Sequence, residues 1–295
     1  MTAADRDAAG AGTGTVTPGA RSLAAGLVRA CHPAPTVAVT GFATVLGVVA
    51  GNPAAGCVVL AAAVLCGQLS IGWSNDRIDA ARDAVAQRPD KPVATGSLPA
   101  PALEIAIALA VAAVVPLSLL LGWRAGVTHL AAVGCGWAYN LRLKSSWWSW
   151  LPYAAAFGAL PAIATLALPA ARLPGAWAVA GAALLGVSAH LGNALPDLDD
   201  DRRTGVRGLP HRLGARGSLL LATGLSALAT VVIVLGPNRP VGALGSAALS
   251  VAGLALLAGV RLASTRPVSR VSFYGVMAMA ALNLALLLAR GGRLH

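Results

Sequence analysis

Charged side chains are scarce in this sequence, and their scarcity limits the class of protein it can encode. Only 11% of the 295 residues are Asp, Glu, Lys or Arg, whereas 57% are hydrophobic. The mean hydropathy of +0.72 is well above what a soluble domain of this length needs for its core. Cysteine and histidine are also rare. The four cysteines show neither metal-ligand spacing nor a disulfide framework, and the five histidines are scattered, which argues against a histidine-based metal site.

Long apolar runs take the place of the missing charge. An apolar stretch of about 17 to 25 residues is long enough to cross a bilayer as a helix. The runs do not alternate between polar and apolar residues, so they do not indicate a membrane β-barrel. We therefore predict an all-α, polytopic membrane protein. Its bundle of nine transmembrane helices is expected at residues 35–51, 54–74, 99–121, 125–141, 150–170, 175–195, 217–235, 241–260 and 271–289.

The first 20 residues differ from the rest of the chain. They are rich in Ala, Gly and Thr and lack the apolar segment of a signal peptide, so residues 1–20 are predicted to form a disordered N-terminal tail. Nothing in the sequence marks a second domain. Residues 21–295 are therefore predicted to form a single transmembrane domain.

The net charge of +11 is divided unevenly between the two sides that nine spans define. With the N-terminus inside, 17 of the 22 Lys and Arg residues fall inside, and the other five are Arg124, Arg172, Arg239, Arg290 and Arg293. Because basic loops stay in the cytoplasm, the pattern predicts an inside N-terminus and an outside C-terminus. Basic residues on that side contact anionic membrane lipids, and we expect no nucleic-acid partner. An Arg-, Ala- and Gly-rich composition indicates a bacterial cytoplasmic membrane.

Eight of the 11 acidic residues form two groups of four. Each group stands where a predicted span ends on the inner side, after the second and the sixth span, so the two groups can face each other at one membrane depth. The first group is Asp76, Asp79, Asp83 and Asp90, and the second is Asp197, Asp199, Asp200 and Asp201.

Helical spacing would place the carboxylates of each group side by side. The residues that would share a face are Asn75, Asp76, Asp79 and Asp83 in one group and Asn193, Asp197 and Asp201 in the other. Like-charged carboxylates so arranged repel each other. A hard divalent cation such as Mg²⁺ offsets that repulsion, because it takes carboxylate and amide oxygens as ligands. The alternative is two solvated helix ends whose aspartates pair with neighbouring arginines.

Basic residues accompany both acidic groups. They are Arg88 and Lys91 after the first, Arg142 and Lys144 after the fourth span, and Arg202, Arg203, Arg207 and Arg212 after the second group. Metal-binding carboxylates next to cations that bind phosphate oxygens indicate a site for a diphosphate. We expect the diphosphate to leave and the rest of the substrate to become a carbocation, inside an apolar bundle that excludes water.

These segments resemble the motifs of the UbiA superfamily of intramembrane prenyltransferases. NDRIDAARD (75–83) resembles the first aspartate motif, and RPDKPVATG (88–96) resembles the loop after it. NALPDLDDDRRTGVRGLPHRLG (193–214) resembles the second motif, most closely that of the branch that prenylates dihydroxynaphthoate. YNLRLK (139–144) and RACHPAPTVAV (29–39) resemble two further family segments.

The resemblance covers about residues 21–290. Two departures stand out: Asp90-Lys91-Pro92 replaces the usual Asn-Arg-Pro, and Pro196 replaces the Arg of the naphthoate branch. The phosphate-binding residues survive both changes, whereas the identity of the acceptor does not transfer from the family.

The resemblance implies an active site at the cytoplasmic side, a prenyl diphosphate donor and two Mg²⁺ ions. One ion would be held by Asn75, Asp76, Asp79 and Asp83, and the other by Asp197 and Asp201, with Asn193 beside them. Diphosphate oxygens would be bound by Arg88, Lys91 and Lys144. The ring of Tyr139 would stabilise positive charge at the reacting carbon, unless this residue is only an interfacial anchor. The expected catalytic residues are Asp76, Asp79, Asp197, Asp201 and Tyr139, and the expected substrate-binding residues are Asn75, Arg88, Lys91, Tyr139, Lys144 and Asn193.

The predicted function is transfer of an isoprenyl group to a small lipophilic, aromatic acceptor inside the membrane. The alternative within the family is a terpene cyclase that uses no acceptor, and both reactions need the same aspartates. A cyclase cavity needs aromatic rings, and this chain has only 3 Phe, 3 Tyr and 7 Trp. Four of the tryptophans look interfacial, namely Trp123, Trp147, Trp148 and Trp150, so the composition favours transfer.

Two other classes of protein are weighed against an enzyme. A transporter also carries charged residues at the mouth of a bundle, but here the acidic groups are confined to one predicted side. In a lipid-binding scaffold, complete metal motifs would have no use.

Overall fold

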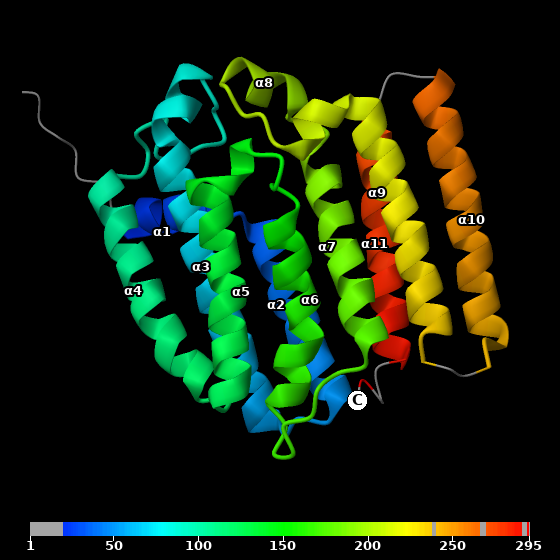
Figure 1. Ribbon diagram of the computed structural model, residues 1–295. Helices are drawn as coiled ribbons and strands as arrows, with labels where there is room; N and C mark the ends of the chain where they lie inside the picture. Colours follow the sequence, from blue (N-terminus) through cyan, green and yellow to red (C-terminus); the bar gives the residue numbers. More distant parts are fainter. Residues whose placement is uncertain (1–19, 238–239, 266–269, 291–293, 295) are drawn as a thin grey trace, which may run out of the picture.

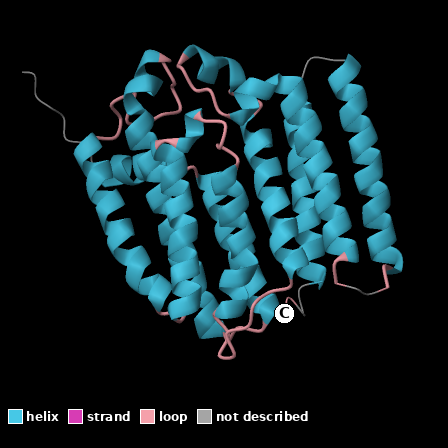
Figure 2. Ribbon diagram, in the orientation of Figure 1, coloured by secondary structure: helices cyan, strands magenta, loops and turns pink. Residues whose placement is uncertain are grey.

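The computed structural model describes residues 20–237, 240–265, 270–290 and 294, and these residues form an all-helical bundle (Figures 1 and 2). The all-α prediction is thereby confirmed. The predicted disordered tail lies outside the described residues, apart from Ala20, where the first helix begins. The helices are α1 (Ala20–Ala30), α2 (Pro33–Ala50), α3 (Ala54–Val85), α4 (Ala100–Leu119), α5 (Trp123–Leu141), the 3₁₀ turn η1 (Leu143–Ser145), α6 (Leu151–Leu166), α7 (Ala176–Ala194), α8 (Leu198–Arg203), α9 (Leu209–Leu235), α10 (Gly242–Thr265) and α11 (Arg270–Arg290).

A helix overlaps each of the nine predicted ranges, although α6 ends at Leu166, four residues before the end of the predicted range 150–170. Within the described residues, five helices are long and apolar enough to cross a membrane: α2, α3, α4, α9 and α10. The apolar helix α6 and the apolar part of α11 are shorter. Two features were not predicted. The helix α1 precedes the first span, and α9 begins at Leu209 rather than 217 because a kink at Gly214, with φ 72° and ψ 175°, joins two helical segments.

Helix α3 is too long to lie wholly within the hydrocarbon of a bilayer. Its 32 residues extend about 48 Å at 1.5 Å per residue, whereas the hydrocarbon is about 30 Å thick. The apolar part comes first, and the last three turns carry Asp76, Asp79 and Asp83. The prediction that Asp76, Asp79 and Asp83 continue the second span as a helix is therefore confirmed, whereas Asp90 lies in the loop after α3.

The corresponding prediction for the second group is wrong. Helix α7 ends at Ala194, and Asp197 lies before the separate short helix α8. Pro196 has no N–H with which to continue the helical ladder, so the backbone turns and Asp197 N donates to Ala194 O at 3.2 Å. Asn193, Asp197 and Asp201 therefore do not share one face of a continuous helix.

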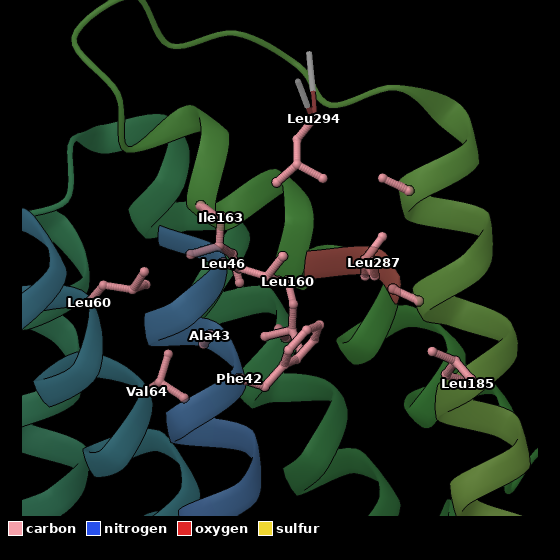
Figure 3. Packing of buried hydrophobic residues seen from close by; sticks show 14 of the residues in the cluster. Phe42, Ala43, Leu46, Leu60, Val64, Leu160, Ile163, Leu185, Leu287 and Leu294 are labelled. Atoms are coloured by element: carbon pink, nitrogen blue, oxygen red, sulfur yellow. The ribbon is translucent and has the colours of Figure 1, made fainter. Parts of the chain in front are cut away.

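The core is built from helices that are far apart in the sequence. Figure 3 shows Phe42 and Leu46 of α2 packed among side chains of α3, α6, α7 and α11. Glycine allows some backbones to approach closely, as small residues do in membrane bundles. A Cβ atom at Gly186 of α7 would lie 2.5 Å from the Tyr153 carbonyl oxygen of α6. These contacts hold α6 and α7 together below the polar end of the bundle.

The connections that carry the predicted site residues lie at one end of the bundle, at the top of Figure 1. They are the α3–α4 loop, the α5–α6 connection with η1, and the segment with α8. At the opposite end, Gly175 N donates to Leu294 O at 2.5 Å, which places this C-terminal residue beside the α6–α7 loop. The predicted polar site therefore lies at one end of the helices, and the apolar core lies between that end and the other.

The uneven charge of the loops predicts that the two ends of the bundle face opposite compartments. In a background without the four native cysteines, Arg203→Cys and Arg172→Cys should be labelled by an impermeant maleimide from opposite sides of sealed membranes. Both positions are exposed, at opposite ends of the bundle. In right-side-out vesicles, we expect Arg203→Cys to be labelled only after the membrane is opened. Labelling of both variants from the same side would contradict the arrangement.

Candidate active site

Asp76 is a buried carboxylate held by a lysine from the loop that follows its own helix. Its side chain lies on α3, where the residue is 2% exposed, and Lys91 Nζ donates to Asp76 Oδ1 at 2.8 Å. The loop folds back because Arg88 N donates to Asp83 O and Lys91 N donates to Arg88 O. His32, which precedes α2, places its Nε2 atom 3.3 Å from Lys91 Nζ. A buried carboxylate thus has its charge balanced by a buried lysine.

Asp79, one turn further along α3, is held by a second lysine from another part of the chain. Lys144 in η1 donates to Asp79 Oδ2, and Arg82 lies 2.5 Å from the same oxygen. Asn75 Nδ2 also donates to this oxygen, at 3.2 Å. Asn140 on α5 accepts a hydrogen bond from Asn75 Nδ2 at 3.3 Å, which positions the end of α5 against α3.

Two carboxylate oxygens of this group are buried and accept no hydrogen bond from the residues that the structure describes, although Lys91 Nζ lies 4.0 Å from one of them, Asp83 Oδ2. Asp76 Oδ2 and Asp83 Oδ2 have no hydrogen-bond donor among the described residues, although buried polar atoms normally have one. Carboxylate oxygens without a donor are the ligands that Mg²⁺ prefers, so the residues present fit such an ion. In the described part of the chain, no three Asp, Glu, His or Cys side chains converge closely enough to hold a metal by themselves. The arrangement therefore suits an ion that takes one or two carboxylates and completes its shell with water and substrate oxygens.

Arg88 connects the two acidic groups. Its guanidinium donates to both oxygens of Asp90, at 3.2 and 3.3 Å, and Nη1 lies 3.8 Å from Asp197 Oδ1. The hydrogen bond from Arg88 lowers the pKa of Asp90. Burial raises the pKa of Asp197, and the charge of Arg88 only partly opposes this effect. The structure thus brings the second acidic group next to the first, as the sequence predicts.

Asp201 is paired with a histidine that the sequence did not single out. His211 Nε2 donates to Asp201 Oδ2 at 3.2 Å. Burial acts to raise the pKa of Asp201, but this hydrogen bond and the charge of Lys144 outweigh burial and lower the pKa. The carboxylate of Asp201 therefore keeps its negative charge, and the positive charge of Lys144 helps to stabilise it.

The remaining acidic residues of the second group are exposed and paired locally. Arg202 Nη1 lies 3.7 Å from Asp199 Oδ1, and Arg203 Nη1 donates to Asp200 Oδ1 at 3.4 Å. Such local ion pairs agree with the expectation that Asp199 and Asp200 are not metal ligands. Asn193 is exposed at the end of α7, and the described residues offer its side chain no hydrogen bond.

Tyr139 lies inside the bundle in an aromatic cluster. Its ring meets those of Tyr153 on α6 and His190 on α7 edge-on, with centroids 5.1 and 5.6 Å away. Tyr153 stacks on His190 at 4.6 Å, and Phe157 lies 6.4 Å from Tyr153. The interior therefore holds more aromatic rings than the composition led us to expect. By contrast, Trp147 and Trp148 are exposed, as expected of interfacial residues.

Sequence reasoning missed three basic residues that contact the predicted charged site residues. They are His32 beside Lys91, Arg82 on Asp79 and His211 on Asp201. Arg82 lies three residues after Asp79, a spacing that brings side chains together on a helix and was a usable signal. His32 and His211 are distant from their partners in sequence, so no spacing rule points to either of them.

Apolar helices that carry carboxylates and lysines at one end define an integral membrane protein with a polar site. The model of the UbiA prenyltransferase family matches residues 23–287. The chain therefore belongs to the UbiA prenyltransferase family. It is 33% identical over 190 residues to the bacteriochlorophyll synthase 33 kDa chain of Cereibacter sphaeroides, and that match spans 60% of each chain.

Solved structures share the fold at low sequence identity. A UbiA homologue from Archaeoglobus fulgidus bound to GPP and Mg²⁺ has a TM-score of 0.69 at 16% identity, covering 90% of this chain and 99% of that one. A digeranylgeranylglyceryl phosphate synthase has a TM-score of 0.71 at 14% identity, covering 91% and 98%. A UbiA homologue from Aeropyrum pernix K1, solved without ligand, has a TM-score of 0.64 at 19% identity, covering 87% and 96%.

The buried pair of Asp76 and Lys91 should make a large contribution to stability. Asp76→Ala leaves a buried ammonium without its nearest partner, and we expect it to cost about 3–5 kcal/mol and to lower the melting temperature of the detergent-purified protein. Glu104→Ala is the matched control, because Glu104 pairs with Arg77 at an exposed site and such pairs contribute about 0–1 kcal/mol.

The double variant Asp76→Ala, Lys91→Met tests the physical reason. Removing the unpaired charge should recover part of the melting temperature that Asp76→Ala alone loses. Equal melting temperatures for Asp76→Ala and Glu104→Ala would contradict the assignment.

Proposed function

We propose that this protein transfers an isoprenyl group from a prenyl diphosphate to a small lipophilic acceptor bearing an aromatic ring, inside the membrane. The observation that carries the proposal is the end of α3, where Asp76 and Asp79 are paired with Lys91 and Lys144 from two different connections. Buried carboxylates lie next to lysines with flexible side chains, at one end of an apolar bundle. This arrangement suits a substrate with a diphosphate head and an isoprenoid tail. The family membership supports this choice of substrate.

The donor's diphosphate would lie between the two acidic groups. Lys91, Lys144 and Arg88 would bind its oxygens, each through N–H donors that now contact carboxylates. The Archaeoglobus homologue was solved with GPP and with DMAPP, each with Mg²⁺, which supports a prenyl diphosphate as the donor.

Two Mg²⁺ ions are the proposed cofactors. Asn75, Asp76, Asp79 and Asp83 would hold one ion, directly or through water, and Asp197 and Asp201 would hold the other. When bound, Mg²⁺ would neutralise charge on the diphosphate and make it a better leaving group. The unpartnered oxygens of Asp76 and Asp83 support the first of these assignments.

The proposed reaction breaks the bond between the allylic carbon and the diphosphate oxygen. The electron pair leaves with the diphosphate, whose charge Lys91 and Lys144 stabilise, and the allylic carbon becomes a cation. The aromatic face of Tyr139 would stabilise that positive charge. A nucleophilic atom of the acceptor then forms the new bond to carbon and gives up its proton, while the apolar bundle keeps water from capturing the cation.

The acceptor is proposed to be a lipophilic ring compound, and the name of the Cereibacter relative supports this class. The second candidate is cyclisation of the donor's own chain. The cluster of Tyr139, Tyr153, Phe157 and His190 favours this candidate, because stacked rings can steady a travelling cation. We propose transfer as the main reaction because the matched family is one of prenyltransferases.

We also propose nine transmembrane helices, with the site at the cytoplasmic side of a bacterial membrane. The basic residues around the site support this orientation, since Arg88, Lys91 and Lys144 lie at the end that carries most of the positive charge. Membrane lipids would surround the bundle and deliver a lipophilic acceptor from the side.

Activity should depend on divalent metal and on both acidic groups. We expect EDTA to abolish release of diphosphate from geranylgeranyl diphosphate and Mg²⁺ to restore it. Asp79→Asn and Asp201→Asn should each lower kcat at least about 100-fold, because each removes a charge that faces the diphosphate site. Asp199→Asn is the control, since among the described residues this exposed carboxylate pairs with Arg202 alone, and it should lower kcat less than about threefold. Full activity of Asp79→Asn in EDTA would contradict the proposed metal role.

The product formed without an acceptor distinguishes transfer from cyclisation. With geranylgeranyl or farnesyl diphosphate and Mg²⁺ alone, we expect slow hydrolysis to the linear alcohol. Adding a hydroxylated aromatic acid or another ring-bearing acceptor should accelerate turnover and give a prenylated product, identified by mass spectrometry of the organic extract. A cyclic hydrocarbon formed rapidly without acceptor would overturn transfer and establish the second candidate.

A further inference from the structure

A basic cavity lies beside the second acidic group. Its volume is about 300 Å³, and it is lined by Arg202, Arg207, His211 and Arg212. Three arginines around one cavity repel each other unless negative charge is present. The reaction proposed above uses none of these four side chains to bind the donor.

The segment before the cavity is fixed by a glycine turn and a buried anchor. Gly205 follows α8 with φ 86°, a conformation that side chains disfavour, and it allows the chain to turn. Val206 is 1% exposed, and its N–H donates to Asp201 O at 2.9 Å. The next residue is Arg207, so its exposed side chain extends from a backbone that is held in place by Val206.

The start of α9 is fixed against the α5–α6 connection. A Cβ atom at Gly208 would lie 2.5 Å from the Lys144 carbonyl oxygen, so the two backbones are in contact there. Leu209 N then donates to the buried hydroxyl of Ser149 at 2.8 Å. His211 and Arg212 follow within the first turn of the helix, so the cavity wall is held on both sides of Gly208.

The arginines are oriented, but two of them lack a carboxylate partner. Arg202 Nη2 donates to His211 O at 2.8 Å. Arg212 Nε donates to Arg207 O at 3.0 Å, and its guanidinium carbon lies 5.3 Å from the centre of the Trp147 ring. Within the described residues, no carboxylate lies within ion-pair distance of Arg207 or Arg212, whereas Arg203 is paired with Asp200.

His211 adds an unsatisfied polar atom to the wall. The residue is 9% exposed and uses Nε2 for Asp201, while its other ring nitrogen, Nδ1, is buried with no partner among the described residues. Buried polar atoms are normally paired with protein, water or ligand. Because Nε2–H is donated to Asp201, Nδ1 of the neutral ring accepts a hydrogen bond, so a water molecule bound with a ligand in this cavity would satisfy that atom.

The donors around the cavity match a phosphate better than a carboxylate. Each guanidinium presents a fork of N–H donors, and one fork is enough for one carboxylate. Three forks suit a group with more oxygens and more charge. A volume of about 300 Å³ is at the lower limit of small-molecule sites, and the four lining residues are three arginines and a histidine, which favours an anion over an isoprenoid chain as the occupant.

We propose that this cavity is a phosphate-binding site separate from the donor site. Two sources could supply the phosphate. One is free inorganic diphosphate, which the reaction releases nearby. The other is the headgroup of an anionic lipid, which can reach this level because the exposed ring of Trp147 beside Arg212 marks the membrane interface. The proposal does not depend on the proposed transfer reaction, since binding is measured without turnover.

The test compares variants that keep the size of the side chain but remove its charge. Arg207→Gln and Arg212→Gln are combined in one protein. The control Arg203→Gln removes one positive charge from a nearby residue that does not line the cavity. In the first arm, labelled inorganic diphosphate is bound to detergent-purified protein in EDTA. In the second arm, retention of phosphatidylglycerol is compared with that of phosphatidylcholine by native mass spectrometry. Melting temperatures of all three proteins report whether the fold is retained.

We expect the double variant to bind at least one probe about 10-fold or more weakly than the wild type, with less than a twofold change for Arg203→Gln. Loss in the diphosphate arm alone identifies a free phosphate ligand, and selective loss of phosphatidylglycerol identifies a lipid headgroup. Binding by the double variant that equals that of Arg203→Gln in both arms would overturn the proposal, as would a wild-type protein that binds neither probe. A lowered melting temperature is resolved by repeating both arms with Arg207→Gln alone, whose exposed side chain has no ion pair to lose in the described part of the chain.

Discussion

The polar end of the molecule depends on one constraint: carboxylates buried at the end of a helix in an apolar bundle must have their charge balanced. Asp76 and Asp79 lie on α3, and their counter-charges come from elsewhere, Lys91 from the α3–α4 loop and Lys144 from η1. Leaving a buried charge unpaired costs several kcal/mol, so each loop is held where its lysine reaches a carboxylate. The α3–α4 loop and the α5–α6 connection are thereby both fixed to the same end of α3.

The same constraint gives the proposed site its chemistry. A lysine that is hydrogen-bonded to a carboxylate can also donate to phosphate oxygens, because an ammonium has three donors and a flexible stem. Arg88 behaves similarly between Asp90 and Asp197. The site therefore offers both donors for an anion and unpartnered carboxylate oxygens for a cation, which are the two requirements of a metal-bound diphosphate.

Most of the fold was predictable because hydropathy determines where apolar helices begin and end. The first acidic group was predictable for a further reason, since it continues a helix whose period is known. Spacing failed for the second group, where Pro196 breaks the helix and leaves Asp197 and Asp201 in a different local geometry. It also failed for His32 and His211, whose partners are brought to them by tertiary packing alone.

One buried hydroxyl shows how closely the parts of this end are connected. Ser149 is 0% exposed, and its Oγ accepts the Leu209 N–H that begins α9 while it lies 3.0 Å from His190 Nε2. His190 in turn stacks on Tyr153 in the aromatic cluster, and α9 carries His211, which holds Asp201. Because Ser149 follows Lys144 by five residues, the lysine, the aromatic cluster and the second acidic group share one short segment. A displacement of that segment would therefore move all three, and the contact between its backbone and Gly208 limits such a displacement.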